Sequence, residues 1–573
     1  MKKKIFTVFA AAITCVALLC GCAAKNTFGD GFVYYKGSVK EFDTSLFYGN
    51  VETMQGADPS LIWVAERDEA GAEIDGGGYY YAYVTATSTI NAWRTKDMTN
   101  WQYLGAVFRP DLDKFWAMRN YWAPAVHYDE TDKTYYMYYS ASDRDETYGK
   151  NTHYVSLATS KTPYGPFEEY NPGNKPTESL RPLVDFSKVP KDHPMYQYGN
   201  SEYGLPDGYF SAIDAEPFVD PVSGQKYLLF TRDRNAAGYT SSDTYIMKMN
   251  EWWDPDYASL SLVSVTGYTA VNGTEEIDEG TVNEGPFMLY RDGLYYLTFS
   301  VHSYEEGSYQ VRQAVGESPM GPFRKVAVEK GGAVITTDGL AMYTNSSGHH
   351  SFIKVGDELY ISYHTFKNDE SIAEARKIRF DKVSFVTNED GLPVIYANGP
   401  TVTLQPLPAE ISGYENKAAA AIVTAEGLAD DADAYWLNDG TIKIHDDSAV
   451  VDETRFRKGK GKITLGWTDY VSAKAIMIYN ACEFESSFTA VDNIRITYRK
   501  DGKEAVVQTG RLEFDYSTFS LEDRHFDCIF AGASVSIQFA DMDIRKIEIE
   551  ISEPKTGDTF AVSEVTVLGR ANA

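Results

Sequence analysis

The feature of this sequence that most restricts its fold is a two-strand unit that occurs five times. Each copy begins with a short segment that contains polar or small residues and continues with an apolar strand, a turn and an aromatic strand; the copies start at positions 58, 122, 214, 284 and 349. The clearest copy is 281–300, TVNEGPFMLYRDGLYYLTFS, in which Asp292-Gly293 joins two apolar runs as a hairpin turn would. Repeats of whole strand units predict four-stranded blades around an axis. We therefore predict an all-β chain with a five-bladed β-propeller at residues 50–405. A pair of β-sandwiches would also explain the strands, but not five similar starts.

The chain changes character after the predicted propeller. Gly399-Pro400 and Leu407-Pro408 mark a boundary, and residues 410–573 contain short alternating runs with weak helical periodicity. This pattern predicts a β-sandwich, jelly-roll-like domain. Such a domain either binds polysaccharide or supports the propeller. Ahead of the propeller, residues 23–49 are predicted to form a tether and a first strand.

The first 22 residues are typical of a targeting segment. Three lysines at positions 2–4 precede an apolar run, and Cys22 ends a Leu-Cys-Gly-Cys stretch that resembles a bacterial lipobox. We predict that residues 1–22 are a lipoprotein signal peptide and that lipidated Cys22 tethers the protein to a bacterial membrane, at the cell surface or in the periplasm. A plain secretory peptide or a short membrane anchor is the alternative. No later apolar run is long enough to cross a bilayer, so we expect membrane contact only through this lipid.

Composition narrows the range of partners. The net charge is −29, and an acidic surface repels phosphate backbones, so nucleic acid is not an expected partner. Aromatic residues make up 14% of the chain, which favours strands and surfaces that stack on sugar rings. Cys482 and Cys528 lie in the folded part, where they either pair or remain two buried thiols. The sequence makes no prediction of oligomeric state.

The starts of the five repeats carry the residues that could do chemistry. The innermost strand of each propeller blade lines a central channel, so these residues are expected to meet near the axis. They are Asp58, Trp122, Asp214, Glu284 and His349. Burying acids without strong bases costs free energy, and a fold tolerates this mainly where the acids are used. Each acid alone could cap a turn, but three at matched positions favour cleavage of a glycosidic bond, which needs a proton donor and a carboxylate that activates water.

Taken together, the motifs resemble a known family. They are Ala57-Asp58-Pro59-Ser60, Trp122-Ala123-Pro124, Ile213-Asp214, Glu284-Gly285-Pro286 and Gly348-His349-His350-Ser351, and in this order they look like glycoside hydrolase family 43. The resemblance covers residues 50–400 and implies an inverting hydrolase on a five-bladed propeller. It implies that Asp58 is the general base, Glu284 the general acid and Asp214 the residue that holds and tunes that acid. Ala215 stands where the family often has proline, which leaves Glu216 and Asp220 as alternatives for the tuning role.

The resemblance also suggests roles for three further residues. His349 would lie near a calcium or sodium ion at the axis, or simply form hydrogen bonds in the channel; the chemistry itself needs no cofactor. Trp122 would form a sugar-stacking wall or pack in the core. Arg376 would donate hydrogen bonds to substrate hydroxyls or lie exposed on a strand.

The predicted substrate is a carbohydrate. The resemblance implies α-L-arabinofuranosidic or β-D-xylosidic bonds in plant polysaccharide or its oligosaccharides; a related propeller glycosidase acting on galactan is an alternative. The Asn-Asp-Pro-Asn signature of fructoside hydrolases is absent at Asp58. The alternative function is that of a non-catalytic surface lipoprotein that binds glycans. The presence of all three acids, Asp58, Asp214 and Glu284, argues against this alternative. Loops at 111–120 and 171–208 are expected to set which sugar is accepted.

Overall fold

The computed structural model describes residues 26–28, 31–37, 41–50, 54–67, 73–86, 88–144, 152–199, 207–233, 240–305, 307–336, 345–366, 376–445, 448–521 and 524–571. The predicted signal peptide and Cys22 lie outside these residues. Within the described ranges no helix has the length and apolar character needed to cross a membrane.

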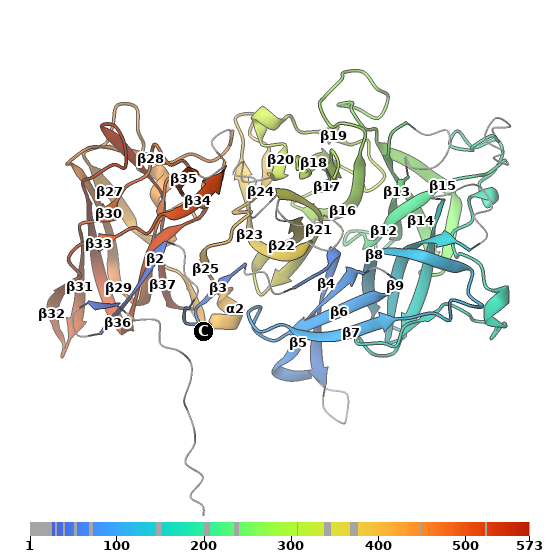
Figure 1. The fold of residues 1–573 in the computed structure, drawn as a ribbon, viewed down its shortest axis with the longest axis horizontal. Helices are drawn as coiled ribbons and strands as arrows, with labels where there is room; N and C mark the ends of the chain where they lie inside the picture. Colours follow the sequence, from blue (N-terminus) through green and yellow to red (C-terminus); the bar gives the residue numbers. More distant parts are fainter. Residues whose placement is uncertain are drawn as a thin grey trace, which may run out of the picture.

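Five antiparallel sheets form the predicted propeller, which Figure 1 shows in blue to yellow. Each has four strands, and the fourth sheet has an additional short one. The strands, blade by blade, are β4 (Ala57–Arg67), β5 (Glu73–Thr85), β6 (Ile90–Thr95) and β7 (Gln102–Phe108); β8 (Ala117–Asp129), β9 (Thr134–Asp143), β10 (His153–Ser160) and β11 (Glu168–Glu169); β12 (Ala212–Val219), β13 (Lys226–Arg232), β14 (Asp243–Glu251) and β15 (Asp254–Ser264); β16 (Asn283–Arg291), β17 (Leu294–Val301), β18 (Gln310–Gly316), β19 (Arg324–Lys325) and β20 (Ala333–Ile335); β21 (Asn345–Val355), β22 (Glu358–Phe366), β23 (Lys377–Thr387) and β24 (Pro393–Ala397).

The blades close into a ring through their inner strands. Each inner strand packs against that of the next blade, and β21 of the last blade packs against β4 of the first. The second strands are buried between neighbouring blades, which is why they are aromatic; β9, for example, is buried over nearly its whole length. The all-β, five-bladed prediction is therefore confirmed, and the pair of sandwiches is excluded.

Every inner strand carries the same two-residue interruption, which explains the repeated motif. The register with the second strand breaks between Ala57 and Ser60 in β4 and at the equivalent place in the other four blades. The first residue inside each break has a positive φ; these residues are Asp58 (51°), Ala123 (46°), Asp214 (56°), Gly285 (56°) and His349 (44°). The second is proline in three blades, which a β-bulge tolerates because the ladder is unpaired there.

These bulges correct the sequence alignment in two blades. Trp122 and Glu284 each precede the positive-φ residue by one position, so the structural equivalents of Asp58 are Ala123 and Gly285. The side chain of Glu284 therefore projects from its strand in a different direction from the side chains of Asp58 and Asp214. Glycine suits the bulge in the fourth blade because a β-carbon on Gly285 would lie 3.2 Å from Cγ of His349.

Most of the remaining strands form a second all-β part, which Figure 1 shows in orange to red with the blue strand β2 in it. Its ten-stranded sheet runs in the order β1-β2-β36-β29-β37-β26, with β27 beside β29, β28 beside β37 and the β31–β32 hairpin beside β36. The bounds are β1 (Asn26–Phe28), β2 (Phe32–Gly37), β26 (Tyr414–Asn416), β27 (Ile422–Glu426), β28 (Thr454–Arg457), β29 (Gly461–Asn480), β31 (Asn493–Lys500), β32 (Lys503–Gln508), β36 (Ser534–Ile551) and β37 (Thr559–Arg570). Isoleucine and valine side chains from β29, β31, β36 and β37 form its core.

Short elements complete the chain. Three small pairings are β3 (Phe47–Gly49) with β25 (Leu404–Pro406), β30 (Ala490–Val491) with β33 (Leu512–Glu513), and β34 (Ser517–Leu521) with β35 (Arg524–Cys528). The helical turns are η1 (Thr177–Ser179), η2 (Phe186–Lys188), η3 (Val328–Lys330), α2 (Ala409–Ser412), η4 (Ala418–Ala420) and η5 (Tyr435–Leu437). Strand β2, although N-terminal, pairs with β36 in the C-terminal sheet. Cys482 and Cys528 form no disulfide with each other.

Candidate active site

A ring of hydrogen bonds holds the bulges of neighbouring blades together. The N–H of a bulge residue donates to a side chain at the end of the second strand in the preceding blade. The four bonds of this type are Ala123 N to Thr85 Oγ1 (2.8 Å), Asp214 N to Ser140 Oγ (3.0 Å), His349 N to Ser300 Oγ (2.8 Å) and Asp58 N to His364 Nδ1 (3.2 Å). Because the bulges lie at the inner strands, this ring gathers their side chains around the axis.

The junction between the third and fourth blades breaks this rule. The hydroxyl at the equivalent position belongs to Thr231, which pairs with Ile213 in the ladder and is buried without a hydrogen-bond partner among the described residues. The Gly285 N–H donates instead to Oδ2 of Asp214, at 3.1 Å. One carboxylate therefore takes the place of a hydroxyl, and it binds the backbone directly after Glu284.

Asp58 lies among cationic and hydrogen-bonding groups. Its Oδ2 accepts the Thr85 hydroxyl at 2.6 Å, and its Oδ1 lies 3.4 Å from Arg376 Nη1, from His349 Nδ1 and from His364 Nδ1. Burial alone would raise the pKa of Asp58, but His349, Arg376 and His364 together outweigh burial and lower it below its ordinary range. Asp58 is therefore a carboxylate that stays ionised.

Asp214 has the opposite environment. It is buried, and its Oδ2 also lies 3.8 Å from His349 Nδ1. Burial, followed by the charges of Glu284 and Asp58, raises the pKa of Asp214 well above its ordinary value. Two neighbouring carboxyls with such repulsion hold a proton between them to higher pH than either would alone.

Glu284 is held by a buried tyrosine. The Tyr309 hydroxyl donates to Glu284 Oε1 at 2.8 Å, and burial raises the pKa of Tyr309 well above 10, so the phenol stays a donor. The tyrosine ring passes close to the Gly348 backbone, where a β-carbon would lie 2.2 Å from it. This contact gives a reason for the glycine of the Gly348-His349 motif.

The structure separates the alternatives for the tuning role. Asp220 lies just beyond the other end of β12, where it accepts hydrogen bonds from Tyr295 (2.7 Å) and from the Ser223 N–H (3.2 Å). Glu216 lines a cavity of about 20 Å³ formed with bulge residues such as Pro59, Ala123 and Pro286, and burial raises its pKa well above the ordinary value. Of the three acids, Asp214 is the one that contacts the Glu284-Gly285 backbone.

His349 and Arg376 both lie against Asp58. His349 Nδ1 stands between the carboxylates of Asp58 and Asp214, and burial lowers its pKa. The part of the chain that the structure describes contains no group of three or more His, Cys, Asp or Glu residues suited to a metal ion. The ion expected near His349 stays a prediction. The Arg376 guanidinium is largely buried and lies 4.9 Å from the centre of the Tyr304 ring.

Trp122 rests on a buried pair that sequence reasoning missed. Its ring lies 4.3 Å from that of His153, centre to centre, with an angle of 31° between the planes. His153 Nδ1 lies 2.9 Å from Asp233 Oδ2, and both residues are at most 1% exposed. The pair joins β10 of the second blade to the residue after β13 of the third. Asp233 is also among the charges that raise the pKa of Asp214. No motif in the sequence marks either residue.

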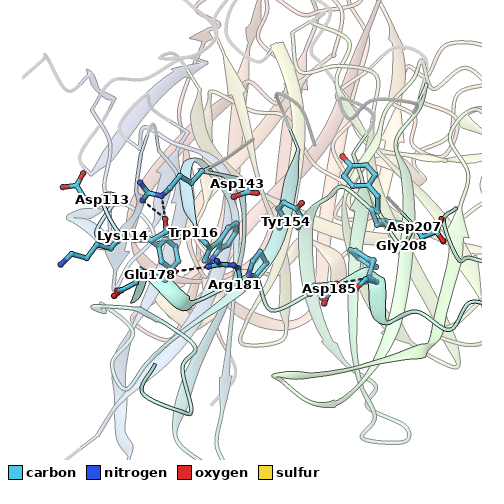
Figure 2. Close-up of a pocket in the computed structure, with 18 residues that line it drawn as sticks. Asp113, Lys114, Trp116, Asp143, Tyr154, Glu178, Arg181, Asp185, Asp207 and Gly208 are labelled. Carbon is cyan, nitrogen blue, oxygen red and sulfur yellow. Dashed lines mark hydrogen bonds between the residues drawn. The ribbon is translucent and has the colours of Figure 1, made fainter. Parts of the chain in front are cut away.

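A separate cavity is lined mainly by residues from the two loops that were expected to choose the substrate. It has a volume of about 680 Å³ and does not include the three carboxylates. Figure 2 shows Trp116, Tyr154, Arg181, Asp185 and Asp207 around it. Tyr154 directly follows His153, so the cavity begins one residue from the support of Trp122. Aromatic rings beside charged side chains are the groups that sugars contact.

One family model matches more than half of this chain, and several known proteins are similar to it. The family model described as "Glycosyl hydrolases family 43" matches residues 66–187 and 200–393, a range that contains Asp214 and Glu284 and begins after Asp58. The chain is 26% identical over 325 residues to "Beta-D-galactofuranosidase xynD" of Aspergillus niger, covering 55% of this chain and 77% of that one. It is also 26% identical over 353 residues to "Probable arabinan endo-1,5-alpha-L-arabinosidase D" of Emericella nidulans, covering 56% and 79%. Among solved structures, a thermostable family-43 glycoside hydrolase is 25% identical with a TM-score of 0.45, covering 63% of this chain and 99% of the other.

Proposed function

Because the chain belongs to glycosyl hydrolase family 43, we propose that it cleaves α-L-arabinofuranosidic or β-D-xylosidic bonds in plant polysaccharide or its oligosaccharides, with inversion at the anomeric carbon. Its activity as a glycoside hydrolase follows from the family; the sugar and the stereochemistry are the proposal. The names of the two curated relatives, a galactofuranosidase and an arabinanase, support a furanose-type substrate. A galactofuranoside is therefore the second candidate, and it would enter the same site.

The observation that carries the proposed roles is the opposite environment of Asp58 and Asp214. Asp58 is surrounded by Arg376 and two imidazoles, which favour its charged form. Asp214 is buried against Glu284, which favours a proton on that pair. Two acids whose surroundings push their pKa values apart are suited to act as base and acid. We assign Asp58 as the general base, Glu284 as the general acid, and Asp214 as the residue that keeps Glu284 protonated and in position.

The proposed reaction is a single displacement. Water held by Asp58 attacks the anomeric carbon while the glycosidic C–O bond breaks. Asp58 takes a proton from the water, and Glu284 gives its proton to the departing oxygen, so the products are a sugar of inverted configuration and an alcohol. Tyr309 donates to Glu284 and stabilises the carboxylate that forms. Exchange with solvent then returns Glu284 to the acid and Asp58 to the carboxylate.

The stereochemistry is directly measurable. We expect proton NMR of a turnover mixture to show, as the first product, the anomer opposite to that of the substrate. Aryl α-L-arabinofuranoside, aryl β-D-xyloside and aryl β-D-galactofuranoside, tested side by side, identify the sugar. Retained configuration would refute a water activated by Asp58, because it requires a second displacement at the same carbon.

Replacement of Asp233 tests the buried pair behind Trp122. Asp214 is faced by Glu284, Asp58, His349 and Asp233, so Asp233→Asn removes one negative charge and lowers the pH at which the acid pair loses its proton. We expect the alkaline limb of kcat/KM to move to lower pH by a fraction of a unit. We also expect KM to rise several-fold, because His153 loses the acceptor that orients it under Trp122.

The control for this change is Asp220→Asn in the same blade. Asp220 faces Ser223 and Tyr295, away from the acid pair, so the alkaline limb should stay where it is in the parent. If Asp233→Asn folds normally and its alkaline limb of kcat/KM lies at the same pH as in the parent, then the charge of Asp233 does not affect the protonation of the acid pair.

We also propose that Cys22 is lipidated and that the protein is anchored to a bacterial membrane, on the strength of the Leu-Cys-Gly-Cys stretch after the apolar run. Labelling of cells with a clickable palmitate analogue should mark the parent and not Cys22→Ser. Equal labelling of both would count against the anchor.

A further inference from the structure

The cavity of about 680 Å³ lies at the same end of the propeller as the three carboxylates, between the second and third blades. Its walls come from the segment before β8, the end of β9, the beginning of β10 and the loop ahead of β12, as Figure 2 shows. Asp143 at the end of β9 pairs with Ala117 at the start of β8, and β8 reaches the Trp122 bulge further along. The cavity is therefore on the catalytic side of the ring, although none of the residues assigned to catalysis lines it.

The two walls of this cavity are joined by hydrogen bonds behind it. On one side, the Trp116 Nε1–H donates to Glu169 Oε1 at 3.2 Å, and the same oxygen accepts the Ser156 hydroxyl at 2.5 Å. On the other side, the Leu183 N–H of the loop ahead of β12 donates to Ser156 Oγ at 3.1 Å. Both walls are thus held in place by the protein itself, which lowers the cost of binding a ligand between them.

The floor of the cavity is aromatic. The rings of Phe186 and Phe210 stack with their centres 4.2 Å apart. Tyr154 stands edge-on to Trp116, with 6.2 Å between the ring centres and 88° between the planes. Phe186, Phe210 and Trp116 are each at most 6% exposed, whereas Tyr154 is half-buried. Tyr154 therefore offers ring surface on which the apolar face of a ligand can pack.

Two guanidinium groups in the wall are bound to the backbone. Arg181 Nη1 donates to the carbonyl groups of Glu178 and Leu180, at 3.2 and 2.7 Å, and Arg144 donates to carbonyl groups of residues 112–115. Neither arginine forms an ion pair with a carboxylate of the described residues. A guanidinium has five N–H groups, so both side chains keep donors for a ligand.

Acceptors lie in the same walls. Asp185 uses Oδ1 for the N–H and the hydroxyl of Ser187. The charged side chains that line the cavity are Asp113, Asp143, Glu178, Asp185 and Asp207 among the acids, and Lys114, Arg144 and Arg181 among the bases. The excess of acids disfavours an anion, and the ammonium and guanidinium groups disfavour a metal ion. Apolar rings together with donors and acceptors suit a sugar ring, which has apolar faces and hydroxyls that both donate and accept.

We propose that this cavity is a second sugar-binding site, which holds a neutral residue of the same polysaccharide at a distance from the cleaved bond. One face of that residue packs on Tyr154, and its hydroxyls accept from Arg181 and donate to Asp185. The volume lies within the roughly 300–1,000 Å³ of ligand sites. This inference rests on the carbohydrate substrate of the proposed function and adds that the enzyme favours long chains, because a chain bound at one site is concentrated at the other.

Arg181→Ala tests the second sugar-binding site through the dependence of activity on chain length. An aryl glycoside carries one sugar, at the position of cleavage, whereas a hexasaccharide extends beyond it. We expect the ratio of kcat/KM for the hexasaccharide to kcat/KM for the aryl glycoside to fall about 3–10-fold in Arg181→Ala, the size expected for one lost hydrogen bond. The fall should come from a higher KM for the hexasaccharide. A ratio equal to that of the parent would overturn the proposal.

The matched control is Lys175→Ala. Lys175 is an exposed cation of the same loop, and it does not line the cavity. Its replacement removes the same charge from an acidic protein as Arg181→Ala does. The ratio for the two substrates should therefore stay at the parent's value. An equal fall in both variants would show that general charge, and not the cavity, sets the preference for long chains.

Binding without turnover separates this proposal from the proposed function. In the Glu284→Gln protein, titration calorimetry with arabinan, xylan and galactan fragments should show a hexasaccharide that binds several-fold more tightly than the disaccharide. Adding Arg181→Ala should remove most of that gain. No gain with any of the three glycans, or a gain that survives Arg181→Ala, would refute the second sugar-binding site. If the gain depends on Arg181 but the parent cleaves neither aryl arabinofuranoside nor aryl xyloside, the proposed sugar is wrong and the second site stands.

Discussion

Glu284→Gln should lose about 10²–10⁴-fold in kcat/KM on a natural oligosaccharide, the range that one general acid supplies. The amide keeps the size of the side chain and can still meet the Tyr309 hydroxyl, but it has no proton of suitable acidity to give to the departing oxygen. The measurement is the initial rate of sugar release by purified parent and variant. Equal rates in the parent and the variant, including zero in both, would refute the assignment of Glu284 as the general acid.

Substrates with different leaving groups distinguish the loss of the proton donor from a general loss of structure in Glu284→Gln. A dinitrophenyl glycoside departs without protonation, so Glu284→Gln should cleave it at a rate much closer to that of the parent. Glu216→Gln is the matched control, because Glu216 is a half-buried acid of the neighbouring inner strand that lines the small cavity between the bulges, whereas the Gly285 N–H donates to Asp214. It should behave like the parent on both substrates. If the dinitrophenyl glycoside lost as much rate as the oligosaccharide, the variant would have lost more than a proton donor.

Asp58→Asn should cause a loss of similar size, also about 10²–10⁴-fold in kcat/KM. The asparagine can still accept the Thr85 hydroxyl, but it cannot take a proton from the attacking water. In contrast to Glu284→Gln, the loss should be equally large for dinitrophenyl and natural leaving groups, because the missing step is on the side of the nucleophile. Rates on the two substrates, measured for both variants, make the distinction.

Azide gives an independent measure of the same step. This anion attacks carbon without a base, so it should restore turnover in Asp58→Asn by forming a glycosyl azide of inverted configuration. Azide should not restore turnover of the natural substrate in Glu284→Gln, because that variant still lacks the acid that protonates the leaving group. If Asp58→Asn kept the parent's rate without azide, Asp58 would not be the base.

The pH dependence follows from the same two environments. The pKa of Asp58 is held low, so the base is ionised over the whole working range and limits activity only in strong acid. Burial, followed by the charges of Glu284 and Asp58, raises the pKa of Asp214, so the acid pair keeps its proton to higher pH and sets the alkaline limb. This second limb is the one that Asp233→Asn should move.

Several features could be read from the sequence because they are local and repeated. Each inner strand needs a bulge with a left-handed residue, and three of the five bulges place proline after it, so the motif recurs wherever a blade begins. Recurrence of that motif predicted five blades. It also identified Asp58, Asp214 and Glu284 as residues that meet at the axis.

Other features could not be read in this way, since they depend on contacts between distant parts of the chain. The one-residue offset of Glu284 from Gly285 becomes visible only in the strand register. His153 and Asp233 lie 80 positions apart and meet because two blades adjoin. Tyr309 reaches Glu284 from the beginning of the third strand of its blade. Strand β2, with its neighbour β1, joins a sheet whose remaining strands follow more than 370 positions later.

The sequence by itself therefore determined the five repeats, the acids that begin three of them and the family of hydrolases that they resemble. These features could be predicted because bulges and strands depend on residues that are neighbours in the sequence. The tertiary structure alone decided which groups surround each acid. Side chains from other blades keep Asp58 as a carboxylate and favour the protonated form of Asp214. Burial and charge at the axis are therefore properties of the assembled ring.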